Sequence, residues 1–294
     1  MNRITVFAPA KVNLALDVTG LLPNGYHALD MVMQALSLGE SVTLEKAQTL
    51  SLALPGSALP ADESNIALKA ARAFFGYTGL AAGAAITVEK HTPVQAGMGG
   101  GSADAAGVLA GLNELYADAL PQKLSMSELL ALGAPLGADV PFALMGGTCR
   151  VQGIGDLLCP LPPLPACGMV IVMPEYGVST PAAFRAFDAV ERPFHPDVAA
   201  LDAAIRRGDY AGVCAAAGNA LEAVGGAAET PAIKQRLRQT GADAALMTGS
   251  GAAVFGLYPT AGAAQAASEV MRREYRQVYT AVPVRGGPVP VAAE

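Results

Sequence analysis

The chain has no tryptophan, only three histidines and only four cysteines among its 294 residues. The cysteines, Cys149, Cys159, Cys167 and Cys214, form no Cys-x-x-Cys pair, so the sequence predicts neither a zinc site nor a disulfide framework. We expect no metal ion held by the protein itself. Buried free thiols in a reducing compartment are the expected state, which indicates a cytoplasmic protein.

Charge is also scarce. Charged residues make up 15% of the chain, and the formal net charge is −6. A negative balance argues against nucleic-acid binding, which needs a basic surface. There is no run of about 18 consecutive apolar residues and no apolar signal-peptide core, so we expect no membrane association. The 52% of hydrophobic residues, much of it alanine, predicts a globular protein, and the length fits two domains of roughly 100–200 residues each.

The most informative stretch is Pro93–Ala106, in which four of the five residues from 97 to 101 are glycine. Apolar residues then repeat at helical spacing from Val108 to Leu115, so the glycines lie at the entrance of a helix. The first N–H groups of a helix have no internal partner, and the helix dipole is positive there. Such an end binds anions, most often phosphate, and Ser102 adds a hydroxyl.

The glycine stretch matches neither of the common nucleotide motifs. The usual phosphate loop ends in Gly-Lys-Ser/Thr, and no lysine follows these glycines. A dinucleotide fingerprint ends in glycine, where this chain has Ser102. On glycine content alone, a phosphate cradle and a flexible turn before a core helix are equally good interpretations.

Two polar positions elsewhere are ambiguous in the same way. Residues 11–18 alternate as a strand after Pro9, with Lys11 and Asn13 on the face opposite its apolar residues. On pattern alone this face is expected to be solvated. Asp139, just before Pro141, fits a helix N-cap, but its apolar neighbours would desolvate the carboxylate and favour acid–base use.

The remaining pattern predicts mixed helices and strands, with a proline-rich linker at residues 160–165 between two halves. The expected strands cover residues 4–8, 11–18, 31–38, 41–46, 49–54, 84–90, 146–155, 169–173, 244–247, 252–257 and 277–282. The expected helices cover the stretch after the glycines and residues 65–75, 125–132, 179–187, 196–207, 209–224, 231–239 and 261–273.

Three separated stretches share a resemblance: Ala8–Leu14 with Gly25–His27, Pro93–Ala106, and Thr248–Phe255. In this order they resemble the three motifs of the GHMP kinase superfamily, which includes galactokinases, homoserine kinases and mevalonate kinases. The resemblance implies an α+β, two-domain GHMP kinase fold. Its N-terminal ATP-binding domain (residues 1–157) would be ribosomal protein S5 domain 2-like, and its C-terminal domain (residues 158–294) would be a ferredoxin-like α/β domain.

Gly-Tyr-His at residues 25–27 and Gly-Ala-Asp-Val-Pro-Phe at residues 137–142 resemble one branch of this superfamily. The resemblance implies ATP-dependent phosphorylation of the 2-hydroxyl of 4-diphosphocytidyl-2-C-methyl-D-erythritol in the non-mevalonate isoprenoid pathway. The phosphoryl donor would be ATP with Mg²⁺. The partner would be a small molecule carrying a cytidine diphosphate group.

The resemblance also assigns roles to individual residues. The catalytic pair would be Lys11 and Asp139, with Asp139 as the general base. The cytidine substrate would be bound by Asn13, Tyr26, His27 and Phe184, with His27 hydrogen-bonding the base and Phe184 stacking on it. ATP would be bound by Pro93, Val94, Gln95, Ala96, Gly97, Met98, Gly99, Gly100, Gly101, Ser102 and Ala103, and by Asn65 and Lys90 near the adenosine. Core packing of Phe184 and helix capping by Asn65 are equally good interpretations.

Two other functions compete with this one. Homoserine or mevalonate phosphorylation is the rival within the superfamily, and Gly25–His27 with the Asp139 motif weighs against it. A non-catalytic nucleotide-binding protein is the rival from another class, and the presence of both Lys11 and Asp139 weighs against that.

Overall fold

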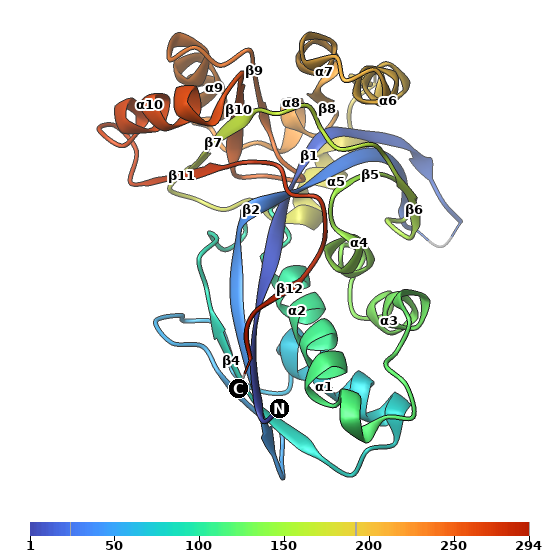
Figure 1. Ribbon diagram of the computed structural model, residues 1–294. Coiled ribbons are helices and arrows are strands. Elements are labelled where there is room, and N and C mark those ends of the chain that lie inside the picture. Colours follow the sequence, from blue (N-terminus) through green and yellow to red (C-terminus); the bar gives the residue numbers. More distant parts are fainter. Residues whose placement is uncertain (24, 192, 294) are drawn as a thin grey trace.

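The computed structural model describes residues 1–23, 25–191 and 193–293. Two long antiparallel strands, β1 (Arg3–Leu21) and β2 (His27–Ala47), run from one half of the molecule into the other (Figure 1). In the described residues they lie inside an eight-stranded sheet whose main path is β12-β1-β2-β4-β3. Both halves are therefore built on one hairpin. The other strands of this sheet are β3 (Ser51–Ala53), β4 (Gly83–Glu89), β5 (Thr148–Gly153), β6 (Leu157–Pro160), β8 (Gly218–Asn219) and β12 (Val289–Ala293).

In the lower half, helices cover one face of this sheet (Figure 1). The predicted helix after the glycines is present as α2 (Gly100–Leu115), which packs against β1 and β2. A Cβ on Gly111 would lie 2.3 Å from Leu44 Cδ1, so the small residue allows this close packing. The neighbouring helices are α1 (Ile66–Thr78), η1 (Ala117–Ala119), α3 (Met126–Gly133) and α4 (Val140–Met145).

The upper half contains a four-stranded sheet in the order β11-β7-β10-β9, again counted over the described residues. Helices α9 (Thr230–Gln239) and α10 (Ala261–Met271) pack on one of its faces. The other face packs on the middle of the β1–β2 hairpin, around Leu14 and Leu36, and on α6 (Val198–Arg206). The strands are β7 (Gly168–Met173), β9 (Ala244–Met247), β10 (Val254–Tyr258) and β11 (Gln277–Ala281).

The sequence predicted that the first strand ends before Pro9. In the structure, β1 instead continues through Pro9. Pro9 pairs with Gly39 inside the strand, and the register shifts directly after it, between Pro9 and Lys11. A β-bulge tolerates proline because its missing N–H is not needed there. The predicted strands 31–38 and 41–46 are likewise parts of one strand, β2.

The predicted helix over residues 209–224 is also wrong. The segment forms α7 (Tyr210–Ala216), strand β8 and α8 (Glu222–Gly225) instead. The break occurs because β8 pairs in parallel with Ala15 and Leu16 of β1. The Asn219 amide also donates to the carbonyls of Met247 and Gly249, at 2.9 and 2.8 Å, so tertiary contacts override the helical pattern.

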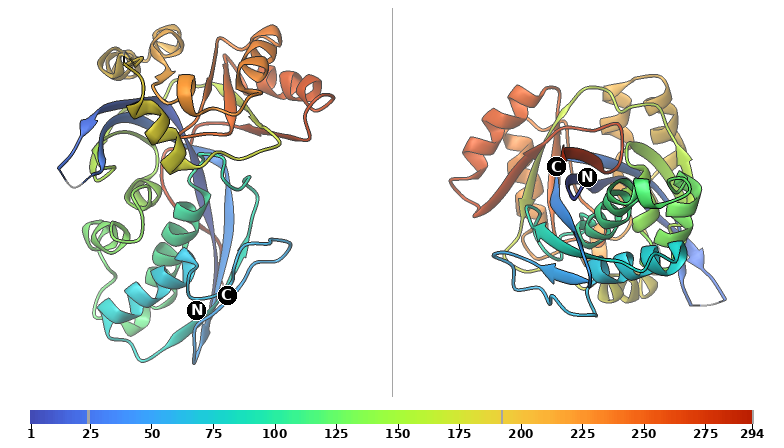
Figure 2. Two further views of the ribbon diagram at one scale, coloured as in Figure 1. Left: turned by 180° about the vertical axis from the view of Figure 1, so that it is seen from behind. Right: turned by 60° about the horizontal axis from the view of Figure 1, so that its bottom comes forward.

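The sequence analysis missed strand β12, which pairs with β1 at Ile4–Phe7. The C-terminal residues therefore return to the sheet of the N-terminal half, and the two termini lie close together at its lower end (Figures 1 and 2). The domain boundary at residues 157 and 158 stays a prediction.

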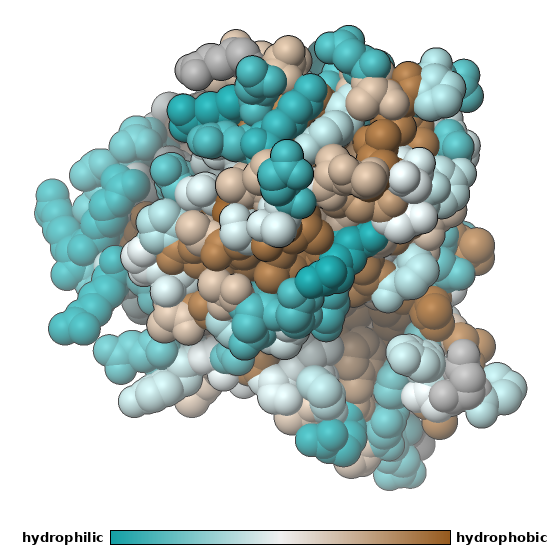
Figure 3. Space-filling model, turned by 90° about the horizontal axis from the view of Figure 1, so that it is seen from below, coloured by the Kyte–Doolittle hydropathy of each residue, from teal (hydrophilic) through white to brown (hydrophobic). Residues whose placement is uncertain are grey.

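Hydrophobic side chains and the thiols differ in how far they are exposed at the surface. Seen from below, hydrophobic side chains form a central band flanked by hydrophilic ones (Figure 3). Among the described residues, none of the helices combines the length and apolar character needed to cross a bilayer. Cys149 and Cys167 are buried, but Cys159 is exposed, so the expectation of buried thiols fails for this residue.

Candidate active site

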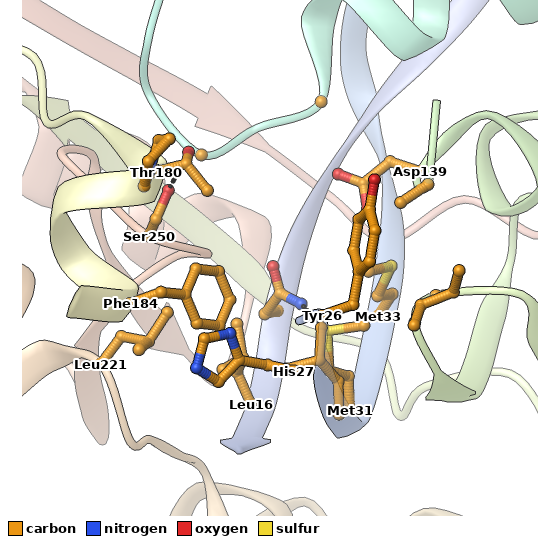
Figure 4. A pocket seen from close by; sticks show the side chains of 18 of the residues that line it. Leu16, Tyr26, His27, Met31, Met33, Asp139, Thr180, Phe184, Leu221 and Ser250 are labelled. Atoms are coloured by element: carbon orange, nitrogen blue, oxygen red, sulfur yellow. Dashed lines mark hydrogen bonds between the residues drawn. The ribbon is translucent and has the colours of Figure 1, made fainter. Parts of the chain in front are cut away.

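A cavity of about 890 Å³ opens where the two halves meet. Its walls come from the β1–β2 hairpin, the glycine loop, the turn before α4, and helix α5 (Thr180–Asp188) (Figure 4). The structure thus brings together residues that lie far apart in the sequence. The predicted site residues on its walls are Lys11, Asn13, Tyr26, His27, Gly97, Gly99, Ser102, Asp139 and Phe184.

Lys11 lies on β1 and is 6% exposed. Its Nζ donates to Asn13 Oδ1 at 2.7 Å and lies 3.4 Å from Asp139 Oδ2. The expectation of a solvated face at Lys11 and Asn13 is wrong, because the glycine loop and the second half of the chain cover this part of β1. A buried ammonium held next to a carboxylate keeps positive charge at the cavity wall.

Asp139 occupies the N-cap position of α4, yet its side chain makes no capping hydrogen bond. Its backbone is helical, at φ −87° and ψ −7°, whereas N-cap residues normally cap from the extended region. The side chain instead pairs with Lys11 and is 30% exposed. The carboxylate is thus available to a molecule in the cavity, and the capping interpretation does not hold.

The glycines are required by close backbone contacts. Gly97 has φ +71°, and a Cβ there would lie 2.2 Å from the Thr248 carbonyl oxygen. Gly99 is the N-cap of α2 at φ +69°, and a Cβ there would lie 3.2 Å from Lys11 Cγ. Both positions suit only glycine, since other residues rarely adopt positive φ.

The third motif supports the loop from behind. The Thr248 hydroxyl donates to the Gly97 carbonyl at 3.3 Å and accepts from the Asn13 N–H at 3.0 Å. The N–H of Ala253 donates to the Ala96 carbonyl at 3.2 Å, and the Lys11 N–H donates to the Met98 carbonyl at 3.0 Å. The three motifs of the sequence therefore form one hydrogen-bonded unit.

A second cavity of about 170 Å³ lies along the same loop and shares Gly97 and Gly99 with the first. The N–H groups at the start of α2 have no partner within the helix, so this region can bind an anion. Met98, another predicted ATP contact, also lines this cavity, but it is buried and packs in the core. The other predicted residues that line this cavity are Lys90, Pro93, Val94, Gln95, Ala96, Gly100 and Gly101.

Two residues predicted to contact ATP form hydrogen bonds within the protein instead. Asn65 caps α1: its Oδ1 accepts from the Ala67 N–H at 2.9 Å, and its Nδ2 donates to the Pro60 carbonyl at 2.7 Å. Ala103 is buried in α2, and its N–H donates to the Gly99 carbonyl at 2.9 Å. Neither residue lines the two cavities described above.

The residues of the predicted nucleoside wall lie together, in an arrangement that the sequence did not indicate. The rings of His27 and Phe184 stack directly on each other, with centroids 4.6 Å apart and planes inclined by 23°. A base does not fit between rings in contact, so it has to stack on a free ring face or displace His27. Tyr26 projects into the same cavity and is 62% exposed (Figure 4).

Sequence reasoning missed two sets of cavity residues. His27 Nε2 lies 2.8 Å from Asp188 Oδ1, and Asp188 follows Phe184 by one helical turn, a spacing that could have indicated it. Thr180, at the start of the helix that carries Phe184 and Asp188, and Ser250 join hydroxyl to hydroxyl at 2.7 Å. Ser250 belongs to the third motif, but its pattern gave no separate signal for a role.

Comparisons with known proteins identify the family of the chain. The model of the GHMP kinases N terminal domain matches residues 65–147, and that of the GHMP kinases C terminal domain matches residues 201–277. A relative from Pelotomaculum thermopropionicum, a 4-diphosphocytidyl-2-C-methyl-D-erythritol kinase, is 42% identical over 94% of this chain and 96% of its own length. The chain belongs to the GHMP kinase family. It is therefore a small-molecule kinase with the expected two-domain α+β fold, and ATP is the phosphoryl donor that this family implies.

Another relative and two solved structures are similar to this chain over most of its length. A 4-diphosphocytidyl-2-C-methyl-D-erythritol kinase from Geobacillus kaustophilus is 41% identical over 87% of this chain and 88% of its own length. A crystal structure of 4-(cytidine 5'-diphospho)-2C-methyl-D-erythritol kinase superimposes with a TM-score of 0.79 at 33% identity, covering 97% of this chain and 100% of that chain. A homoserine kinase from Cytophaga hutchinsonii reaches the same TM-score at 19% identity, covering 99% and 98%, which shows the shared fold alone.

Proposed function

We propose that the protein transfers the terminal phosphoryl group of ATP to the 2-hydroxyl of 4-diphosphocytidyl-2-C-methyl-D-erythritol. The products are the 2-phosphate and ADP, in the non-mevalonate isoprenoid pathway. The observation that carries the proposal is the pair of Asp139 and buried Lys11, 3.4 Å apart, on a cavity wall shared with the glycine loop. Relatives of about the same length that bear this kinase name support it.

The pair supplies the chemistry that the reaction needs. The Asp139 carboxylate takes the proton of the 2-hydroxyl, whose oxygen attacks the terminal phosphorus of ATP while ADP leaves. The Lys11 ammonium stabilises negative charge on the attacking oxygen. Asn13 holds Lys11 by a 2.7 Å hydrogen bond and orients the acceptor hydroxyl.

The loop and α2 supply the site for the ATP phosphates. The N–H groups at the start of α2 and the positive end of its dipole bind them. Mg²⁺ bound together with ATP would neutralise part of the phosphate charge. Ser102 lines the large cavity, and its hydroxyl would contact the ion or the phosphates.

The other end of the cavity would take the cytidine. Phe184 and Tyr26 offer aromatic faces, and His27 offers a ring nitrogen for a hydrogen bond. Stacking combined with hydrogen bonds to the base edge is the usual way in which a protein reads one base. The cavity also reaches Asp139, so one substrate can extend from the nucleoside wall to the base.

A coupled assay of ADP release tests the proposal. The purified protein is given ATP, Mg²⁺ and one alcohol at a time: the cytidine diphosphate substrate, homoserine or mevalonate. We expect ADP release only with the cytidine substrate. Turnover of homoserine or mevalonate without turnover of the cytidine substrate would overturn the substrate assignment.

A further inference from the structure

A buried cluster of charged side chains lies against the glycine loop. Of its members, Lys90 was predicted to contact ATP, and the carboxylates of Glu40 and Asp104 have no role in the reaction described above. Glu40 of β2 is fully buried, and the side chains of Lys90, directly after β4, and Asp104, in α2, are 10% and 5% exposed. Lys90 Nζ lies 3.0 Å from Glu40 Oε1 and 2.9 Å from both carboxylate oxygens of Asp104. One ammonium therefore ties together β2, β4 and α2.

The cluster holds one more carboxylate than ammonium group. Buried carboxylates destabilise a fold unless hydrogen bonds compensate them, and apolar replacements of buried ion pairs are often neutral or stabilising. Glu40 has such compensation: its Oε2 accepts from the His91 N–H at 2.6 Å, and its Oε1 accepts from the Thr92 hydroxyl. Burial still raises the pKa of Asp104 to about 6, although Lys90 acts to lower it. Stability alone therefore does not account for this group of charges.

The cluster touches the backbone where α2 begins. Lys90 Nζ lies 3.4 Å from the Gly100 carbonyl oxygen. A Cβ on Gly100 would lie 2.8 Å from Thr92 Oγ1 and 3.2 Å from Glu40 Oε1, so the helix start rests on the cluster with no room for a side chain. The small cavity beside the loop is lined by four residues of this region: Lys90, Thr92, Gly100 and Asp104.

We infer that Glu40, with Lys90 and Asp104, is a positioning residue that fixes the first N–H groups of α2 where the ATP phosphates bind. Glu40 acts through Lys90 and Gly100 and does not touch ATP itself. The inference rests on the proposed function, because it assumes that the loop binds ATP. Phosphoryl transfer depends chiefly on positioning, so displacement of these N–H groups weakens ATP binding.

The test replaces Glu40 by glutamine, which keeps the size of the side chain. The substitution replaces one acceptor oxygen by an NH₂ group, which donates. This group then faces another donor, from His91, Thr92 or Lys90, so one hydrogen bond or ion pair of Glu40 is lost. Binding of a non-hydrolysable ATP analogue with Mg²⁺ is measured by calorimetry. We expect the Kd of the analogue to rise about tenfold in Glu40→Gln and the KM for the cytidine substrate to stay unchanged. Thr92→Val, which removes one donor to Glu40, has a smaller effect in the same direction.

Glu45→Gln is the matched control, because Glu45 lies on the same strand but is half-exposed and pairs with Arg3, at 3.3 Å. We expect it to bind the analogue as the wild type does. A purely structural role would lower the melting temperature of Glu40→Gln and leave the Kd of the folded protein unchanged, which overturns the inference. If Glu40→Gln does not fold, wild-type affinity in Thr92→Val overturns it. Failure of the wild type to bind the analogue would instead count against the proposed function.

Discussion

Lys11 Nζ lies 3.4 Å from Asp139 Oδ2, although the two residues come from a central strand and from the start of a short helix. Lys11 is buried and Asp139 is partly open to the cavity, so the pair presents a carboxylate with a fixed cation behind it. A substrate hydroxyl that reaches Asp139 therefore also meets the positive charge that its developing oxyanion needs.

Replacement of Lys11 separates charge stabilisation from binding. Lys11→Met keeps the aliphatic stem but removes the ammonium, so we expect kcat to fall by about 10²–10³-fold. ATP affinity should change little, because the phosphate-binding groups belong to the loop. Steady-state kinetics and calorimetry with an ATP analogue measure the two effects. A kcat close to that of the wild type in a folded variant contradicts the assignment.

Substitution of the nucleoside wall affects the cytidine substrate selectively. Phe184→Ala removes a stacking face, and aromatic stacking on a base is worth about 1–3 kcal/mol. We expect the KM for the cytidine substrate to rise about tenfold or more in Phe184→Ala and also in His27→Ala, with the KM for ATP unchanged. Tyr77→Ala, on the exposed side of α1, is the control. An unchanged KM for the cytidine substrate in both variants removes this wall from the site.

A side chain at Gly97 disrupts the loop. Alanine there combines φ +71° with a Cβ placed 2.2 Å from the Thr248 carbonyl oxygen. We expect Gly97→Ala to weaken ATP binding by about tenfold or more, since the third motif can no longer hold the loop. Gly56→Ala is a matched control, because Gly56 has φ +70°, but a Cβ there would meet no atom of the described residues within 4 Å, apart from its two chain neighbours. Equal ATP affinity in both variants contradicts this explanation.

Asp104 gives the protein a specific pH dependence of stability. Burial raises its pKa to about 6, so the native state holds a proton that the unfolded chain releases at lower pH. The free energy of unfolding contributed by Asp104 therefore falls as the pH rises from about 4 to about 6. Over this range, the free energy of unfolding of the wild type should fall by up to about 3 kcal/mol relative to that of Asp104→Asn. Urea unfolding of both proteins at several pH values measures it, with exposed Asp118→Asn as the control. Parallel pH curves for wild type and Asp104→Asn contradict the raised pKa.

Local sequence patterns predicted the parts of the fold that local interactions determine. The glycines followed by apolar residues at helical spacing predicted α2. The predicted helix over residues 125–132 is present as α3, which begins at a capping box of Ser125 with Glu128. Pro9 inside β1 and the break at Gly218–Asn219 depend on partners far away in the chain, and no local pattern reveals them.

The site shows the same division. Alternation along β1 placed Lys11 and Asn13 on a solvated face, because a strand pattern cannot show that a distant loop covers it. Only the combination of motifs in the resemblance indicated their role, which stays a prediction. Glu40 gave no signal, since one acidic residue in a strand is usually exposed.

The proposed reaction is tested by a comparison of the wild type with Asp139→Asn, given ATP, Mg²⁺ and 4-diphosphocytidyl-2-C-methyl-D-erythritol. Phosphorus NMR identifies the product, and calorimetry with an ATP analogue measures nucleotide binding. We expect a new phosphate at the 2-position with the wild type, and nearly complete loss of turnover with unchanged nucleotide binding in Asp139→Asn. Normal turnover in Asp139→Asn, or no phosphorylated product from the wild type, would contradict the proposed reaction.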